Sequence, residues 1–174
     1  TWDVPLFLSG HLHVQHCKRS EDNRGIWEMV TASLATPSCK YAILTYRDDR
    51  SFLYRTQSLD VEAWAKKNQC TEEDLLNFKQ FQTPFLRRVF YNQAIASLNE
   101  VPELTDSERE QMAQLYSLLK FHYYQGTAYQ VQELVRNDPA YELWQEDGMA
   151  TQQGEYFRYI LEDGKRDYNR LEVN

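Results

Sequence analysis

The sequence predicts an α+β fold in which a β-rich part is followed by a longer helical part. The apolar residues change pattern near residue 59, from short runs typical of strands to the spacing typical of helices. Apolar residues make up 42% of the 174 residues and aromatic residues 14%, which is too much for a disordered chain and enough for a core of normal size. Six glycines and five prolines are few, which favours a helix-rich body. We therefore expect strands in residues 1–58 and helices in residues 59–174.

Short apolar runs in the first part predict four strands. These runs are residues 4–8, 26–31, 41–46 and 51–56. The first run ends at Ser9 and Gly10, so we expect a buried strand that leads into a turn. The last two flank the polar stretch 47–50 and are expected to form a hairpin. The polar stretch 18–25 is expected to be a loop.

Helix start and stop signals organise the second part. Asp60 is placed to cap a helix that ends near residue 67, and residues 71–74 resemble a second capped start. Pro84 is expected in the first turn of a further helix. Residues 105–108 form a capping box that opens the clearest helix, and Gly126 is a plausible stop for it. Shorter helices are expected at about 128–136, 139–145 and 152–161.

Charge, hydropathy and cysteine usage exclude several classes of protein. The net charge is −7, from 19 Lys and Arg against 26 Asp and Glu, which argues against a nucleic-acid backbone partner. No apolar run approaches the roughly 18 residues of a membrane-spanning helix. Cys17, Cys39 and Cys70 contain no Cys-x-x-Cys pair, and we expect three reduced thiols. A Cys39–Cys70 disulfide is the open alternative.

The start of the chain leaves the cellular compartment open. The sequence begins at Thr1 without an initiator methionine and shows no signal-peptide pattern. Both observations fit a mature or a truncated chain, so no localisation is predicted.

Two histidines separated by one residue, His11 and His13, come directly after the first expected strand. On extended chain they would project to the same side and could address one metal ion or two adjacent ones. Neutral imidazole is a good ligand for Zn, Mn or Fe, and Gly10 is expected to let the chain turn sharply. A bare His-x-His pair is more often solvated than metal-bound, but the preceding apolar strand and glycine favour a metal site.

The stretch from Leu8 to His13 resembles Gly-His-x-His, the last metal-binding motif of the calcineurin-like metallophosphoesterases. Residues 25–34 are similar to the strand that follows this motif in bacterial members. The helical remainder resembles, less specifically, the C-terminal extension of some of them. The resemblance implies that residues 1–58 are the C-terminal strands of a metallophosphoesterase β-sandwich, and that residues 59–174 are a helical extension.

The same resemblance implies a hydrolase with two divalent metal ions, Mn, Fe or Zn. His11 would be a ligand of one ion and His13 of the other, with Gly10 and His16 near the site. The ions would activate a water for attack on a phosphate monoester or diester. No other catalytic residue is assigned.

The other motifs of that family do not occur in the sequence. Asp-x-His, Gly-Asp-x-x-Asp and Asn-His are all missing. We therefore expect this chain to be the C-terminal part of a longer phosphatase-like enzyme, with the remaining metal ligands upstream in the same polypeptide. The chain alone is expected to be inactive towards its phosphate-ester substrate.

Three other interpretations stay open. His16 and Cys17 could join His11 and His13 in a single zinc site, although so short a segment seldom wraps one ion. His122 is more simply a satisfied core or edge histidine, and the aromatic residues of the helices are more simply core. Finally, the chain could be a non-enzymatic interaction module with a β-meander and helices, in which the two histidines are coincidental.

Overall fold

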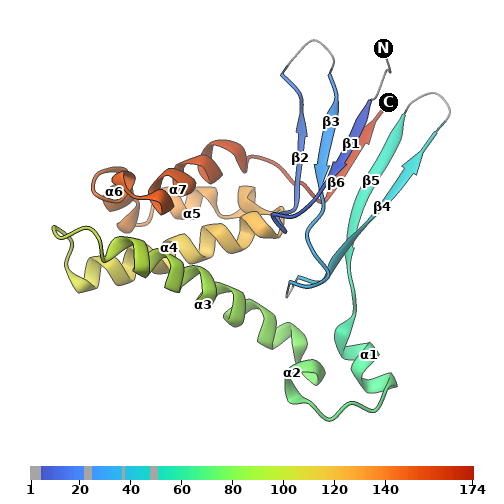
Figure 1. The fold of residues 1–174 in the computed structure, drawn as a ribbon, viewed down its shortest axis with the longest axis horizontal. Helices are drawn as coiled ribbons and strands as arrows, with labels where there is room; N and C mark the ends of the chain where they lie inside the picture. The colour runs from blue at the N-terminus through green and yellow to red at the C-terminus, as the bar shows by residue number, and fades with distance from the viewer. Residues whose placement is uncertain (1–4, 22–24, 37, 48–50) are drawn as a thin grey trace. The chain divides into compact units, whose positions relative to one another are not determined.

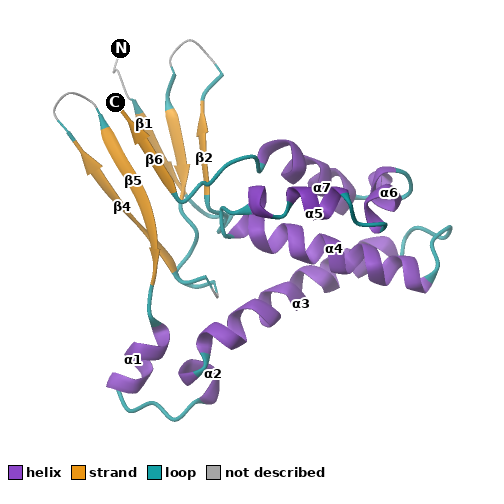
Figure 2. Cartoon of the chain, turned by 180° about the vertical axis from the view of Figure 1, so that it is seen from behind, coloured by secondary structure: helices purple, strands orange, loops and turns teal. Residues whose placement is uncertain are grey.

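The computed structural model of the protein describes residues 5–21, 25–36, 38–47 and 51–174. Within these residues it contains two three-stranded sheets and seven α-helices, which confirms the α+β class (Figure 1, Figure 2). Val4 and residues 48–50 of the expected turn lie outside the described residues.

The chain divides into two compact units. The first comprises Thr1–Phe78, Tyr124–Gly126 and Asp167–Asn174, and the second comprises Lys79–Tyr123 and Thr127–Arg166. The expected domain boundary between residues 58 and 59 stays a prediction.

The first sheet has the strand order β1-β3-β2. Its strands are β1 (Leu6–Ser9), β2 (His16–Arg19) and β3 (Trp27–Val30), with β1 parallel and β2 antiparallel to β3. The prediction of a loop from residue 18 onward is wrong for β2. This strand has no alternation of apolar and polar residues that would predict it. It forms by pairing with β3, in which Lys18 lies opposite Glu28.

Strand β1 is not buried as the apolar run predicts. Phe7 and Leu8 are each 57% exposed. Among the described residues β1 pairs only with β3, so it is an edge strand with apolar side chains in contact with solvent.

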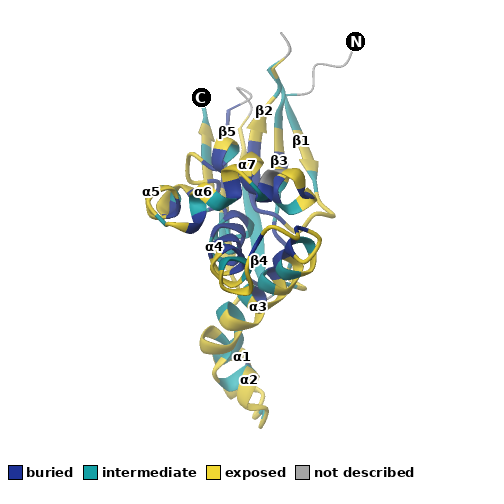
Figure 3. Ribbon diagram, turned by 90° about the vertical axis from the view of Figure 1, so that its left-hand side faces the viewer, coloured by how far each residue is buried: buried dark blue, intermediate teal, exposed yellow. Residues whose placement is uncertain are grey.

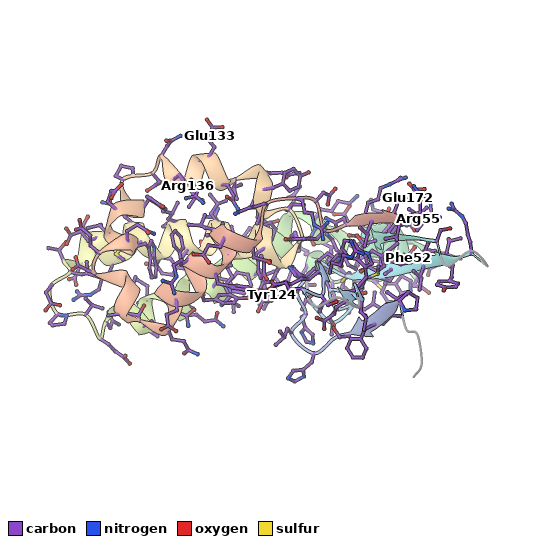
Figure 4. All side chains as sticks on the ribbon, turned by 90° about the horizontal axis from the view of Figure 1, so that it is seen from above. Phe52, Arg55, Tyr124, Glu133, Arg136 and Glu172 are labelled. Carbon is purple, nitrogen blue, oxygen red and sulfur yellow. The ribbon has the colours of Figure 1, made fainter. Side chains whose placement is uncertain are left out.

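The second sheet has the order β4-β5-β6. Strands β4 (Lys40–Tyr46) and β5 (Phe52–Ser58) form the expected antiparallel hairpin. Strand β6 (Arg170–Val173), which the sequence did not predict, pairs with β5 near the end of the chain. Phe52 of β5 is buried, whereas Arg55 of β5 and Glu172 of β6 are exposed (Figure 4).

The core of the first unit lies between the two sheets. Its buried members come from both sheets and from the segment before β6, namely Cys17, Met29, Phe52, Tyr54 and Tyr168. Cys17, Cys39 and Cys70 are all free thiols, so the alternative Cys39–Cys70 disulfide is not formed.

Two short helices follow β5. Helix α1 (Val61–Lys67) is capped as predicted, since the Asp60 side chain accepts a hydrogen bond from the backbone N–H of Ala63 at 3.0 Å. Helix α2 (Glu73–Leu76) lacks the expected capping box. The N–H of Thr71 instead donates to the Glu72 carboxylate at 3.0 Å.

Two long helices, α3 (Phe78–Leu98) and α4 (Asp106–Tyr124), begin the second unit. Pro84 lies inside α3 rather than in its first turn, because the helix starts at Phe78 and tolerates the single backbone donor that proline removes. The predicted capping box at the start of α4 is confirmed. The N–H of Thr105 donates to the Glu108 carboxylate at 2.8 Å, and the N–H of Glu108 donates to the Thr105 hydroxyl at 3.3 Å.

The rest of the second unit consists of short helical pieces. They are η1 (Ala128–Gln130), α5 (Gln132–Arg136), α6 (Ala140–Gln145), η2 (Gly148–Ala150) and α7 (Gln152–Asp163). Helix α4 forms the centre of the core, and many of its residues are buried (Figure 3). Trp144 and Phe157 are fully buried and stack with ring centroids 5.1 Å apart, which confirms the core interpretation for these two residues, whereas Tyr129 and Tyr159 are exposed. None of the described helices combines the length and the apolarity needed to cross a bilayer.

Candidate functional site

The chain turns directly after β1, where the sequence predicts the metal ligands. Ser9 ends the strand, and His11, Leu12 and His13 are all exposed. The imidazoles of His11 and His13 are therefore open to solvent and to anything that docks on this end of β1.

The backbone of this turn differs from the expectation of extended chain. His11 has a φ of 80° and His13 a φ of 58°, both in the left-handed region that residues with a side chain rarely adopt. The expectation that the two imidazoles project to the same side assumes extended chain and therefore does not apply here. Gly10, which was expected to make the sharp turn, has open space around it, and the positive φ angles fall on the two histidines instead.

A buried glutamine fixes the chain directly after His13. Gln15 is fully buried, and its amide nitrogen donates to the Tyr54 hydroxyl at 3.0 Å and to the Tyr168 carbonyl at 2.8 Å. Its amide oxygen accepts from the Ala32 N–H at 3.3 Å. No sequence pattern indicates this role, because Tyr54 and Tyr168 are distant from Gln15 in the chain. Gln15 anchors the exposed turn to the core of the first unit.

His16 does not lie on a loop. It is in β2, only 8% exposed, with its ring centroid 4.4 Å from that of Tyr168. Its expected place near the site stays a prediction. Its neighbour Cys17 is buried, and the thiol donates to the Tyr168 carbonyl at 3.5 Å.

The described residues contain no cluster of three or more potential metal ligands. The alternative zinc site built from His11, His13, His16 and Cys17 is therefore not assembled. The expectation that His11 and His13 bind metal ions stays a prediction.

His122 has a hydrogen-bond partner, as expected for a satisfied core or edge histidine. Its Nδ1 lies 3.1 Å from the Thr127 hydroxyl. Burial lowers the pKa of His122, and the positive charge of Arg87 lowers it further. The neutral ring is thus favoured at the end of α4.

The comparison with known families matches residues 60–167 to the C-terminal domain of cyclic nucleotide phosphodiesterase. No curated protein matches the chain. The resemblance to the calcineurin-like metallophosphoesterases is corrected by this finding, since the matching family is a different one. The match carries no information about a metal ion or a bacterial source, but it identifies a phosphodiesterase-related module. Because it covers more than half of the sequence, the chain belongs to the family of C-terminal domains of cyclic nucleotide phosphodiesterases.

Proposed function

We propose that this chain is the C-terminal module of a phosphodiesterase that hydrolyses cyclic nucleotides, and that its β1–β2 turn supplies two ligands to the metal centre of that enzyme. The observation that carries the proposal is the conformation of the turn, in which His11 and His13 are both exposed and both left-handed. The family supports the substrate class, because its description names cyclic nucleotide phosphodiesterase.

The backbone conformation supports a functional role for the two histidines. A non-glycine residue held in the left-handed region costs roughly 1–3 kcal/mol and is found preferentially at functional sites. His11 and His13 both have this conformation and are separated by one residue. Their side chains are exposed and so contribute little to packing. The hydrogen bonds of Gln15 stabilise the chain directly after His13 and so help to hold this conformation.

The chemistry of the two side chains fits divalent transition-metal ions. Neutral imidazole binds Mn, Fe and Zn, and we assign His11 to one ion and His13 to a second. Bound ions of this kind lower the pKa of a coordinated water and neutralise the charge of a phosphodiester. The role of this chain's residues is to hold the ions at the end of β1.

The rest of the phosphodiesterase must complete the centre. Two imidazoles make too few bonds to retain two ions, and the described residues offer no third ligand beside them. The chain alone is therefore expected to have no activity, and its partners are the remaining part of the enzyme and the phosphodiester substrate.

The proposal is tested in the complete enzyme by substituting His11→Ala and His13→Ala separately. We expect each variant to lose a large part of its transition-metal content, measured by elemental mass spectrometry, and to lose most of its hydrolysis of cyclic AMP. Leu12→Ala is the matched control, because Leu12 is 66% exposed in the same turn and cannot bind a metal.

Unchanged metal content and activity in both histidine variants would refute the proposal. That result would favour the second candidate, a non-enzymatic interaction module. The exposed apolar residues Phe7, Leu8 and Leu12 are the observation that supports this alternative, since they offer a surface for a protein partner.

A further inference from the structure

Arg87 of α3 is an incompletely paired cation in the second unit. Its terminal nitrogen Nη2 donates to the Gln114 carbonyl at 3.4 Å and to the Ser117 hydroxyl at 3.3 Å, both long hydrogen bonds to neutral acceptors. Its Nε is shielded from solvent and has no hydrogen-bond acceptor among the described residues. A guanidinium that is partly removed from water normally has an anionic partner, because its desolvation is otherwise uncompensated.

A pocket of about 350 Å³ opens beside this guanidinium, between α3 and α4. Arg87 and Arg88 line it together with the hydroxyl-bearing residues Thr83, Tyr91 and Ser117. The pocket is therefore lined by two arginines and by the hydroxyls of Thr83 and Tyr91, whereas the Ser117 hydroxyl donates to the Gln114 carbonyl at 2.8 Å; none of the residues that line it is acidic.

We propose that this pocket binds the phosphate group of a small molecule of nucleotide size. The cationic guanidinium groups of Arg87 and Arg88 attract the oxygens of a phosphate, and the hydroxyls of Thr83 and Tyr91 add further donors. A volume of about 350 Å³ lies within the range of small-molecule sites. The proposal does not depend on His11 and His13, which belong to the other unit.

The acidic side chains nearby restrict where the anion can lie. A second pocket of about 530 Å³ is also lined by Arg87, but it carries the carboxylates of Glu110 and Asp138. These carboxylates repel an anion on their side of Arg87. The protein as a whole has a net charge of −7, so a phosphate is attracted by a local cationic site and not by the net charge.

His122 provides a reporter for the occupied pocket. It lies on α4, and the charge of Arg87 contributes to its lowered pKa. A phosphate bound to Arg87 offsets that charge, so the pKa of His122 should rise when the pocket fills. The ring protons of His122, followed by NMR during a pH titration, report this change without any enzymatic assay.

The test is titration calorimetry on the 174-residue chain with inorganic phosphate and with adenosine 5′-monophosphate. We expect saturable binding of both, tighter for the nucleotide if the natural ligand is a nucleotide and equal for both if it is free phosphate. Arg87→Gln should weaken binding about tenfold or more, since it removes one of the two cationic groups that line the pocket. Arg88→Gln should weaken it severalfold, whereas Arg158→Gln, an exposed arginine of α7, should have no effect.

Several outcomes would overturn the proposal. They are absence of saturable binding, equal affinity in the wild type and Arg87→Gln, or binding of a glutamate-rich peptide but of neither phosphate compound, which would indicate a protein partner. If Arg87→Gln does not fold, the Arg88→Gln affinity and the His122 titration of the wild type decide. Binding that persists in EDTA and in His11→Ala separates this site from the proposed metal centre.

Discussion

Lys120 is a buried cation held among aromatic rings. Its Nζ lies 5.1 Å from the ring centroids of Phe90 and Tyr116 and 4.9 Å from that of Tyr156. It donates to the Gln93 side-chain oxygen and to the Tyr116 hydroxyl, both at 2.9 Å. Burial lowers the pKa of Lys120 from its ordinary 10.5 to about 8.

This lowered pKa predicts that the contribution of Lys120 to the stability of the protein increases as the pH rises from about 8 to about 10.5. In that window the unfolded lysine still holds its proton while the folded one has released it, so the free energy of unfolding increases with pH. The full effect is at most about 3 kcal/mol. Urea denaturation near pH 7.5 and near pH 10 should show a larger gain in the wild type than in Lys120→Met.

The comparison must be made as the difference between wild type and Lys120→Met. Lys40 has a similar pKa of about 8, lowered by burial and partly restored by Asp167, and it titrates in both proteins. Equal increases in stability in the two proteins would show that Lys120 does not change its protonation there.

The roles of some residues of the two proposed sites can be predicted from the sequence, and those of others cannot. His11 and His13 are visible because their spacing and the preceding apolar run lie within a few positions. Gln15 and Arg87 are not, because their roles depend on partners that folding brings together, such as Tyr168 for Gln15 and Ser117 for Arg87.

At the level of elements, the start of α4 shows how local signals decide a helix. The reciprocal bonds between Thr105 and Glu108 involve only residues three positions apart, so the sequence contains all the information for this boundary. Hydrogen bonds from Thr105 also lower the pKa of Glu108, which indicates that they favour the charged carboxylate.

We predict that Thr105→Ala lowers the stability of the protein by about 1 kcal/mol at neutral pH. The hydroxyl that accepts from the Glu108 N–H is lost, and one helical donor is left without its cap. The contribution of the carboxylate is present above the ordinary pKa of glutamate and fades as the pH falls through the lowered one, so the loss should shrink in acid.

Thermal unfolding of Thr105→Ala at neutral and acidic pH measures this effect. Ser107→Ala is the control, because Ser107 is exposed in the same turn and its hydroxyl only accepts from Gln111. Equal losses in the two variants would contradict a specific cap.

The sequence predicts neither β2 nor the start of α3 correctly, because neither has a distinctive pattern in its own residues. β2 has the polar sequence His-Cys-Lys-Arg, and it becomes a strand because β3 supplies the hydrogen-bonding partner. The start of α3 was placed at Pro84, since proline is common at helix starts, but the preceding residues from Phe78 are helical as well.

At the level of the whole molecule, the first unit is assembled from distant parts of the sequence. Asp167–Asn174 belongs to the same unit as the first 78 residues, and β6 pairs with β5 across more than 100 positions. Sequence patterns predicted the class and most of the helices, but not this pairing. Strand β6 is only four residues long, and no turn next to it in the sequence connects it to its partner β5.

We predict that Leu171→Ala destabilises the first unit by about 1–3 kcal/mol. Leu171 lies opposite Tyr54 in the sheet and packs against the core between the two sheets. Glu172→Ala, at the next and exposed position of β6, should change stability by less than about 0.5 kcal/mol. Urea denaturation followed by circular dichroism distinguishes the two, and equal losses would show that β6 contributes little to that core.

The late position of β6 also constrains how the protein is made. A ribosome translates β4 and β5 before the second unit, so their sheet lacks β6 until the second unit has been translated. The edge of β5 that pairs with β6 therefore lacks this partner while residues 59–169 emerge. During this interval the nascent chain carries an open strand edge, which is the stage of its synthesis most exposed to mispairing with other chains.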